Sequence, residues 1–570
     1  MTASTTSSPQ PNWIELYTPK LVTTLREGYG LRHLRADAVA GITVAIVALP
    51  LSMAIAIASG VTPAQGLYTA IVGGFLVSAL GGSRFQIGGP AGAFIVLVSA
   101  TVAAHGVDGL IIATILSGFI LAIAGFLRLG TYIKFIPYPV TVGFTAGIAI
   151  IIFASQVKEF LGLQLAQPEP GPLATKLPVL WKSIGTIDPT VVAISLATVA
   201  TIVILKRLRP QWPGMLLAVA AAALATAILD LPVATIGTRF GGIPSTLPLP
   251  SVPELDFAKI QAVLPSAISF ALLGSIESLL SAVVADGMTG RRHRSNCELV
   301  GQGIANIASG LFGGFCVTGT IARTATNVRS GAHGPVAGML HAAFLLAFIV
   351  LAAPLASSIP LASLAAVLAV VAWAMIERHA IATLLQSSRG DATVLVVTFL
   401  LTIFRDLTEA IVVGFALGSV LFIYRMSQTT ALEMHAPLID EDRADDVDGT
   451  RRPYDEGSSS DPDVVVYRIS GAFFFGAAAA IGTVLDRIAQ THRALIIDFA
   501  AVPFLDSTAA KTIEGLAKNA ARRGTQIVLT GTSQSVRQEL AAHGAKPPLV
   551  TFTRDIDTAL ARLKPKTDSH

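Results

Sequence analysis

The chain has 570 residues, of which 52% are hydrophobic and only 13% are charged, and its formal net charge is +4. Soluble domains carry about a quarter charged residues, so this composition argues against an ordinary soluble protein and indicates a membrane protein. The small net charge does not indicate a nucleic-acid partner.

Apolar runs follow one another from Ala38 to Tyr424, separated by short polar breaks. A helix needs about 20 apolar residues to cross the bilayer. Fourteen segments are candidates, although the third and the tenth are too short or too interrupted for an ordinary span. The sequence therefore predicts fourteen transmembrane segments. Their expected starts are Ala38, Gly66, Ala91, Leu110, Pro139, Val191, Gly214, Val263, Glu298, Thr318, Pro335, Ser363, Ala392 and Glu409.

Positive charges predict the orientation of these segments. If residues 1–35 are cytoplasmic, basic clusters such as KRLR (206–209) and RRHR (291–294) also fall on the cytoplasmic side, as the positive-inside rule requires. The short loops near Val61 and Ser357, on the other side, carry no basic residue. An even number of segments places both termini on one side. We therefore expect a protein of the inner or plasma membrane with both termini in the cytoplasm.

Two stretches of the apolar region resemble each other. GLYTAIVGGFLVSALGG (66–82) and ELVGQGIANIASGLFGG (298–314) both end in Gly-Gly, and they precede FQIGGPAG (85–92) and FCVTGTIA (315–322). Glycine-rich membrane segments also match by chance, because glycine permits close helix packing. With seven segments in each half, the second half enters from the opposite side. The match therefore predicts a 7+7 inverted repeat.

Each repeat contains a break that predicts a half-helix, at the third and the tenth segment. An extended stretch would reach the bilayer midplane, and a helix would begin there, at Pro90/Ala91 and at Thr318/Gly319. Pro90 suits a first helical turn because it lacks the amide hydrogen. Each helix N-terminus offers unpaired N–H groups and about half a positive charge. Two such ends facing each other predict an anion site built mostly from backbone.

Two ionisable residues fall inside the predicted segments: Glu277 in the eighth and Arg323 in the tenth. Arg323 would add a positive charge to the anion site. Glu277 could neutralise Arg323, bind a coupling cation or take up a proton, and Ser281, one turn later, adds an oxygen on the same face. The alternative for both charges is a structural ion pair between two helices. Asp286 and Glu298 fall at the cytoplasmic edge, where we expect solvated charges.

A change in composition after Arg425 marks a second domain. The transmembrane domain is expected over 36–426, followed by an acidic linker rich in Ser, Gly and Pro over 427–462. Predicted strands VVVYRIS, ALIIDFA and TQIVLTG then alternate with helices, which predicts a small α/β domain over 463–564 before a tail at 565–570. The sequence shows no catalytic constellation and no nucleotide loop. It predicts a protein that is not an enzyme and needs no cofactor beyond a coupling ion.

Several long motifs resemble the sulfate permease family. DAVAGITVAIVALPLSMAIAIASGVTPAQGLYTAIVGGFLVSALGGS resembles its first two spans, and GGPAGAF resembles its third. SNCELVGQGIANIASGLFGGFCVTGTIARTATNVRSGAHG is similar to its ninth-to-tenth-span signature, and with GSIESLLSAVVAD it looks most like the bicarbonate-transporting branch. LIIDFAAVPFLDSTAAKTIEGL resembles the STAS domain of these proteins. The resemblance covers essentially the whole chain.

The resemblance implies an α-helical membrane protein with fourteen spans in a 7+7 inverted repeat, and a cytosolic STAS domain. A core domain would carry the substrate between the two half-helices and move against a gate domain, as an elevator. The family is commonly dimeric, so the resemblance also implies a homodimer in the bilayer. By position, the implied substrate contacts are Ala91, Gly92, Ala93, Phe94, Thr320, Ile321, Ala322 and Arg323.

The chain departs from the family at several of its site positions. Leu51 stands where many relatives have glutamine, and Ala91 and Ala322 stand where some have a hydroxyl. With fewer side-chain hydrogen-bond donors, more of the anion's binding would depend on backbone amides. The sodium-coupled branch has aspartate and threonine at the positions of Glu277 and Ser281, which argues against Na⁺. The coupling ion, H⁺ or Na⁺ at these two residues, stays open.

The expected function is secondary active transport of a small anion, with sulfate first and bicarbonate second. The alternatives are a C4-dicarboxylate symporter, an uncoupled anion channel and a membrane-tethered signalling protein whose output is the STAS domain. Ser507 falls where related regulatory domains are phosphorylated. The preferred interpretation is that Asp506 and Ser507 cap the following helix. The domain is expected to be a regulatory or assembly module with a cytosolic protein partner.

Overall fold

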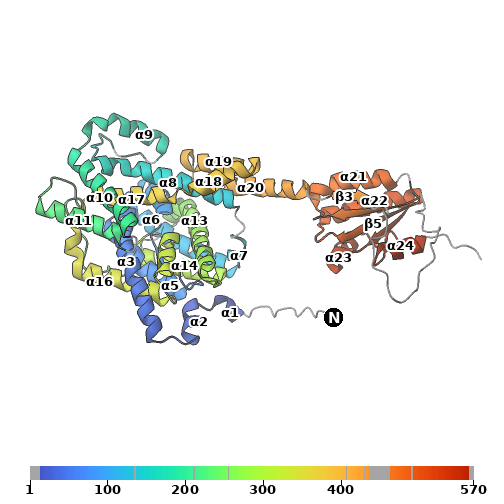
Figure 1. Ribbon diagram of the computed structural model, residues 1–570, viewed down its shortest axis with the longest axis horizontal. Helices are drawn as coiled ribbons and strands as arrows, with labels where there is room; N and C mark the ends of the chain where they lie inside the picture. The colour runs from blue at the N-terminus through green and yellow to red at the C-terminus, as the bar shows by residue number, and fades with distance from the viewer. Residues whose placement is uncertain are drawn as a thin grey trace, which may run out of the picture. The chain divides into compact units, whose positions relative to one another are not determined.

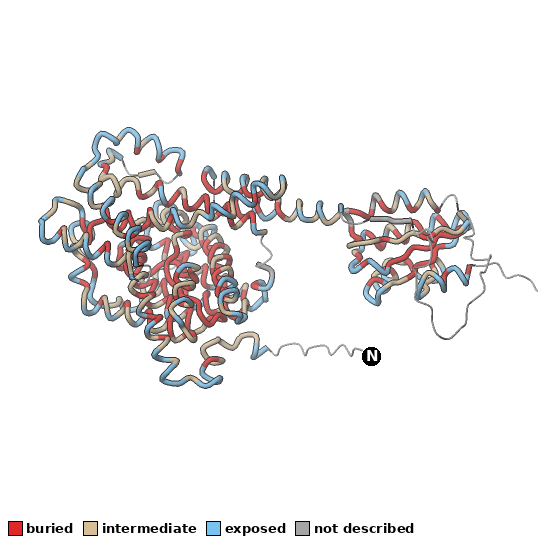
Figure 2. Tube along the Cα trace, viewed as in Figure 1, coloured by how far each residue is buried: buried red, intermediate tan, exposed pale blue. Residues whose placement is uncertain are grey.

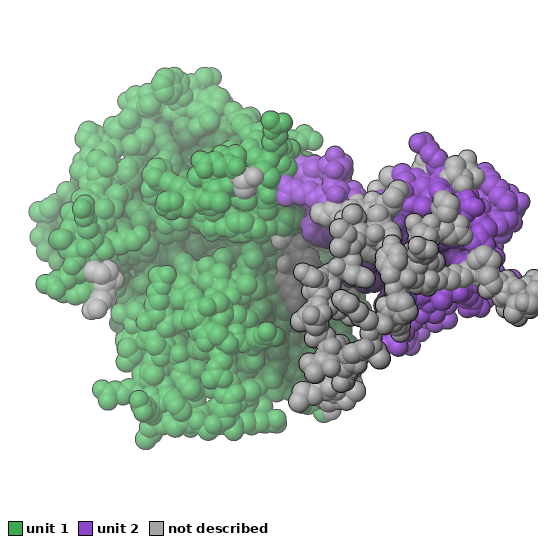
Figure 3. Space-filling model, turned by 45° about the vertical axis from the view of Figure 1, so that its right-hand side comes forward, with its two compact units in different colours: residues 1–415 green, residues 416–570 purple. Residues whose placement is uncertain are grey.

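The computed structural model forms two compact units, residues 1–415 and residues 416–570 (Figures 1 and 3). The first unit is helical, and the second is built around a sheet. The described residues are 13–133, 137–167, 169–170, 172–209, 212–254, 256–405, 407–428, 431–434, 463–489 and 492–563.

The long helices of the first unit follow the predicted apolar segments. Within the described residues, nine helical stretches are long and apolar enough to cross a membrane, so the count of fourteen stays a prediction. The main helices are α3 (Leu31–Ala58), α4 (Pro63–Tyr68), α5 (Gly74–Leu80), α6 (Ile95–Phe126), α8 (Tyr138–Leu161), α10 (Pro189–Leu208), α11 (Gly214–Ile228), α13 (Phe257–Thr289), α14 (Ser295–Leu311), α15 (Ile321–Arg329), α16 (Val336–Ala356), α17 (Leu361–Met375), α19 (Arg389–Phe404) and α20 (Leu407–Gln428). Shorter helices are α1 (Trp13–Tyr17), α2 (Lys20–Arg26), α7 (Gly130–Ile133), α9 (Leu173–Lys182), α12 (Ile236–Phe240) and α18 (Arg378–Ser387), and a π-helical turn (Thr69–Gly73) joins α4 to α5.

The third and fourth predicted segments form one helical stretch in the structure. Gly106, with φ 70° and ψ −177°, interrupts α6 between them. Only glycine adopts this backbone conformation at little cost, so it allows the half-helix to end and the next helix to follow directly.

The helices of the first unit pack in two groups. In one group, α13 and α14 pack on α6, and α16 packs on α3 and α5; in the other, α17 and α19 pack on α8, and α10 packs on α11 and α17 (Figure 1). A Cβ on Gly118 of α6 would lie 2.6 Å from the Gly303 carbonyl oxygen of α14, so these two backbones touch. Buried residues occur in both groups and make up most of α14 in the first and of α17 in the second (Figure 2). Contact between the groups is made mainly by α3 with α17 and α11.

The second unit confirms the predicted α/β domain. Its strand order is β3-β4-β5-β6-β7, with β3 antiparallel to β4 and the other neighbours parallel. The strand β3 falls within the predicted linker, because Ala431 pairs with Ser470; residues 435–462 and 565–570 lie outside the described residues. The elements are β3 (Ala431–Met434), β4 (Val464–Ser470), α21 (Phe475–Ala489), β5 (Ala494–Ala501), α22 (Ser507–Arg523), β6 (Gln526–Thr530), α23 (Gln534–Ala542), β7 (Thr551–Phe552) and α24 (Ile556–Leu563).

Candidate anion-binding site

The two extended stretches predicted from the repeat lie side by side. Strand β1 (Gly88–Gly89) pairs antiparallel with β2 (Thr318–Gly319). Gly88 is opposite Gly319, and Gly89 is opposite Thr318. The pairing brings together segments that are more than two hundred residues apart in the chain. It therefore places the starts of the two half-helices next to each other.

Both half-helices begin from equivalent backbone conformations. Ala91 is the N-cap of the first, with φ −110° and ψ 145°, and a 3₁₀ turn (Gly92–Phe94) continues into α6. Thr320 is the N-cap of α15, with φ −110° and ψ 122°. The start predicted at Pro90/Ala91 agrees with the N-cap at Ala91, whereas the start predicted at Thr318/Gly319 was too early, because pairing with β1 keeps these two residues extended. Pro90 precedes the N-cap and is not in the first turn.

The extended backbone finds its hydrogen-bond partners on flanking helices. The Ile87 N–H donates to Thr324 Oγ1 at 3.1 Å, and the Thr320 N–H donates to the Ile87 carbonyl at 3.0 Å. The Val317 N–H donates to Asn306 Oδ1 at 3.0 Å, and Asn306 Nδ2 donates back to the Val317 carbonyl at 2.9 Å. Non-helical backbone needs such partners inside a membrane. Neutral side chains of α14 and α15 supply them.

Glu298 corrects one expectation, because it is buried and not solvated. Its Oε2 accepts the Ser83 N–H at 2.9 Å, and its Oε1 accepts Gln86 Nε2 at 2.7 Å and the Ser278 hydroxyl at 3.2 Å. The first turn of α14 turns this carboxylate toward the stretch that leads into β1. Glu298 therefore links α13 and α14 to that stretch through hydrogen bonds. The sequence did not indicate this role, because Glu298 lies at the end of a predicted segment.

Arg323 lies in the interior beside β1, and only 2% of its surface is exposed. Its Nη2 donates to Ser52 Oγ of α3 at 3.3 Å and to the Pro90 carbonyl at 3.2 Å. Within the described residues, its Nε and Nη1 have no hydrogen-bond partner, and the predicted alternative of an ion pair with Glu277 is not formed. A buried cation without a counter-charge is unfavourable. This guanidinium therefore favours the arrival of an anion.

The other positions that the resemblance implies as substrate contacts surround the two helix starts. The Phe94 ring packs against Phe270 of α13, with 6.1 Å between centroids, so only its backbone can face an anion. A Cβ on Gly92 would lie 3.4 Å from Ile152 Cδ1 of α8 and 3.8 Å from Met375 Sδ of α17. The helix starts therefore meet the second group of helices. Ala91, Ala93, Phe94 and Thr320 are buried, Gly92 and Ile321 are half-buried, and Ala322 is exposed.

The two predicted coupling residues differ in their surroundings. Glu277 is half-buried on α13 and has no hydrogen bond or ion pair to the described part of the chain. Ser281 is buried, and its hydroxyl is 3.0 Å from Thr324 Oγ1 of α15. The serine oxygen is therefore held by α15, while the carboxylate remains available to a cation.

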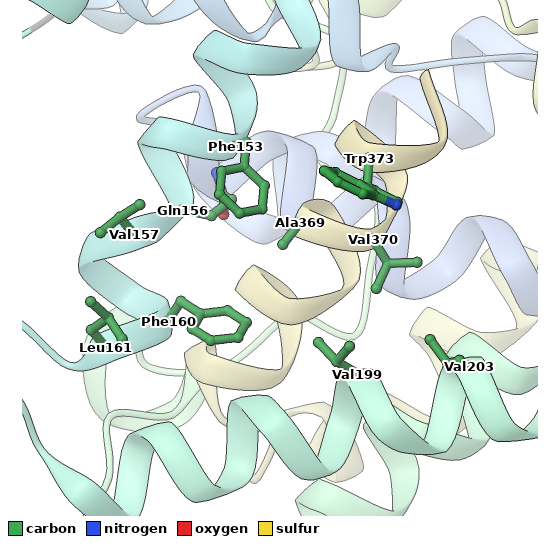
Figure 4. Close-up of a pocket in the computed structure, with 10 residues that line it drawn as sticks. All are labelled: Phe153, Gln156, Val157, Phe160, Leu161, Val199, Val203, Ala369, Val370 and Trp373. Atoms are coloured by element: carbon green, nitrogen blue, oxygen red, sulfur yellow. The ribbon is translucent and has the colours of Figure 1, made fainter. Parts of the chain in front are cut away.

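A separate cavity of about 520 Å³ lies among α8, α10 and α17 (Figure 4). Figure 4 shows its lining as apolar side chains, apart from the Gln156 amide and the indole nitrogen of Trp373. A cavity with so few hydrogen-bond donors is unsuited to an anion. It is distinct from the half-helix starts.

In the second unit, Ser507 is exposed at the start of α22. Asp506 is the N-cap, and its Oδ1 accepts the Ala509 N–H at 2.8 Å. This confirms the preferred capping interpretation for Asp506.

Comparison with known proteins identifies both units. The Sulfate permease family model matches residues 34–398, and the STAS domain model matches residues 459–559. The chain is 38% identical to the putative sulfate transporter YvdB of Bacillus subtilis over 526 residues, which covers 91% of this chain and 95% of that protein. It is 32% identical to the bicarbonate transporter BicA of Picosynechococcus sp. over 527 residues, covering 89% and 90%.

Solved structures resemble the fold. The SLC26A9 structure matches with a TM-score of 0.83 at 17% identity, covering 95% of this chain and 92% of that one. The transmembrane domain of a cyanobacterial bicarbonate transporter, BicA, matches with a TM-score of 0.60 at 32% identity, covering 68% of this chain and 98% of that one. Both comparisons agree with a helical membrane transporter fold.

Proposed function

Because the chain belongs to the sulfate permease family of anion transporters, we propose that it performs secondary active transport of a small anion. The observation that carries this proposal is Arg323, a buried guanidinium beside two helix N-termini that has no counter-charge among the described residues. The anion would be bound by this side chain and by the backbone amides of 91–94 and 320–322. Sulfate is the first choice and bicarbonate the second, which the names of YvdB and BicA support.

The two packing groups of helices support an elevator mechanism. The half-helices, with Arg323, belong to the group that contains α3, α6 and α13. The group formed by α8, α10 and α17 meets the site through Ile152 and Met375. Because contact between the groups is limited, the first can move as a body against the second. Such a movement would carry the anion across the bilayer without unfolding its site.

Glu277 is the proposed coupling group. A half-buried carboxylate with no partner in the described part of the chain suits a proton, or Na⁺ with Ser281 as a further oxygen ligand. A channel needs no coupling site, so this residue favours coupled transport over the uncoupled alternative.

The remaining proposals concern location and regulation. The protein would lie in the inner or plasma membrane as a homodimer, with both termini in the cytoplasm. The STAS domain would bind a cytosolic protein, and phosphorylation of Ser507 would place negative charge at the favourable end of α22.

Uptake of labelled sulfate, bicarbonate and fumarate into proteoliposomes, under imposed Na⁺ and H⁺ gradients, tests the proposal. We expect one gradient to drive accumulation of sulfate, and Glu277→Gln to abolish accumulation, while Glu409→Gln, an exposed acid of α20, does not. Anion equilibration without a gradient would indicate a channel. Accumulation of fumarate alone would indicate a dicarboxylate symporter.

A further inference from the structure

His341 is a buried histidine in α16 that the proposed mechanism does not use. The side chain is fully buried, and neither ring nitrogen has a hydrogen-bond partner within the described residues. Buried polar atoms are normally hydrogen-bonded. An imidazole that lacks both partners among the described residues is therefore a candidate for a change of protonation state, or for contact with a polar ligand, during function.

His341 and Arg323 lie beside the same short strand. A Cβ on Gly74 of α5 would lie 2.7 Å from the Gly88 carbonyl oxygen and 4.0 Å from His341 Cε1, which places the imidazole near Gly88. A Cβ on Gly89 would lie 2.0 Å from Arg323 Nη1. Arg323 thus lies against Gly89, and His341 lies against Gly74, which itself contacts Gly88. Within the described residues, both groups have nitrogens without a hydrogen-bond partner.

Among the described residues, Arg323 is the charged group that acts electrostatically on His341. Helix α16 has no other ionisable residue, and neither the π-helical turn nor α5 has any. The part of α3 after Ala38 has none either. Helix α15 adds only Arg329, which is exposed at its end. The charge state of the imidazole therefore depends on Arg323 and on whatever binds there.

Two cations near each other in a low-dielectric interior repel strongly, whereas an anion between them attracts both. We propose that His341 is a proton-binding group linked to the anion site: it takes a proton from solvent when an anion binds at Arg323 and releases it when the anion leaves. Linkage is reciprocal, so a proton on His341 must also strengthen anion binding. The inference rests on the proposed anion site, and His341 is a group separate from Glu277 on α13.

Calorimetric titration of the purified full chain with sulfate tests this inference. Sulfate remains a dianion across the range in which imidazoles titrate, and buffers of different ionisation enthalpy report the protons taken up. For the wild type we expect uptake of up to one proton per sulfate, and an affinity that rises by up to about tenfold per pH unit as pH falls. His341→Gln should bind sulfate without proton uptake and without this pH dependence. His379→Gln, an exposed histidine of α18, should behave as the wild type.

Two results would overturn the inference. The first is sulfate binding by the wild type without proton uptake. The second is proton uptake that persists unchanged in His341→Gln, whether or not it is lost in Glu277→Gln. If the wild type binds neither sulfate nor bicarbonate at any pH, the proposed anion site fails as well.

Discussion

At the scale of single residues, the position of Arg323 depends on a glycine. The guanidinium lies against β1, and a Cβ on Gly89 would be 2.0 Å from its Nη1. Gly89 has an ordinary negative φ, so space and not backbone strain requires glycine here. The Gly-Gly-Pro sequence therefore does two things: it permits the strand pairing, and it leaves room for the charged side chain of the other half.

Gly89→Ala is predicted to displace the guanidinium from Ser52 and Pro90, because the new Cβ would take the place of Nη1 and the flexible end of the arginine side chain would have to move. Sulfate uptake in proteoliposomes should fall by about tenfold or more. The matched control is Gly287→Ala on α13, where a Cβ would meet nothing within 4 Å. Equal uptake by the two variants would show that the position of Arg323 is unimportant.

At the scale of elements, the stretch that leads into β1 is fixed by one carboxylate. Glu298→Ala would leave the Ser83 N–H buried without its acceptor, and Gln86 Nε2 would keep only Ser278 Oγ, at 2.6 Å. A buried donor that loses its partner costs about 1–3 kcal/mol. We expect a clearly lower thermal unfolding midpoint in detergent, whereas Glu409→Gln, at an exposed pair, should leave the midpoint unchanged. An unchanged midpoint in Glu298→Ala would contradict the role given to this network.

The elements also show what could be predicted from the sequence. Pro90 and the paired Gly-Gly stretches revealed the interrupted helices, because glycine and proline weaken or end the helix that an apolar segment otherwise forms. The start at Thr320 could not be placed, since it depends on pairing between β1 and β2. Ser52 and the role of Glu298 were missed for the same reason: their hydrogen-bond partners lie on elements distant in the chain. His341 was missed because only the fold brings α16 against α5.

At the scale of the whole molecule, the two units have separate cores. Every residue proposed to bind the anion or the coupling ion lies in the first unit. The family and the α/β domain could be predicted from long motifs and from the alternation of strand and helix patterns. The strand β3 could not be predicted, because it forms by pairing with β4 in a segment whose composition is typical of a linker.

Removal of the chain after Arg425 is predicted to reduce sulfate uptake in proteoliposomes without abolishing it, because the anion site and both helix groups remain. The amount of protein inserted must be matched to that of the full chain. Complete loss of uptake by a correctly inserted truncation would favour a protein whose activity depends on the STAS domain.

The central claim is that Arg323 holds the transported anion, and it is tested most directly by sulfate uptake into proteoliposomes containing Arg323→Ala. Arg329→Ala, which removes an exposed charge from the same helix, is the matched control. Removal of one partner of a buried charge pair costs upward of about 2 kcal/mol, so the apparent sulfate affinity should fall at least about thirtyfold in Arg323→Ala. Uptake by Arg323→Ala with the same apparent affinity as Arg329→Ala would contradict the account.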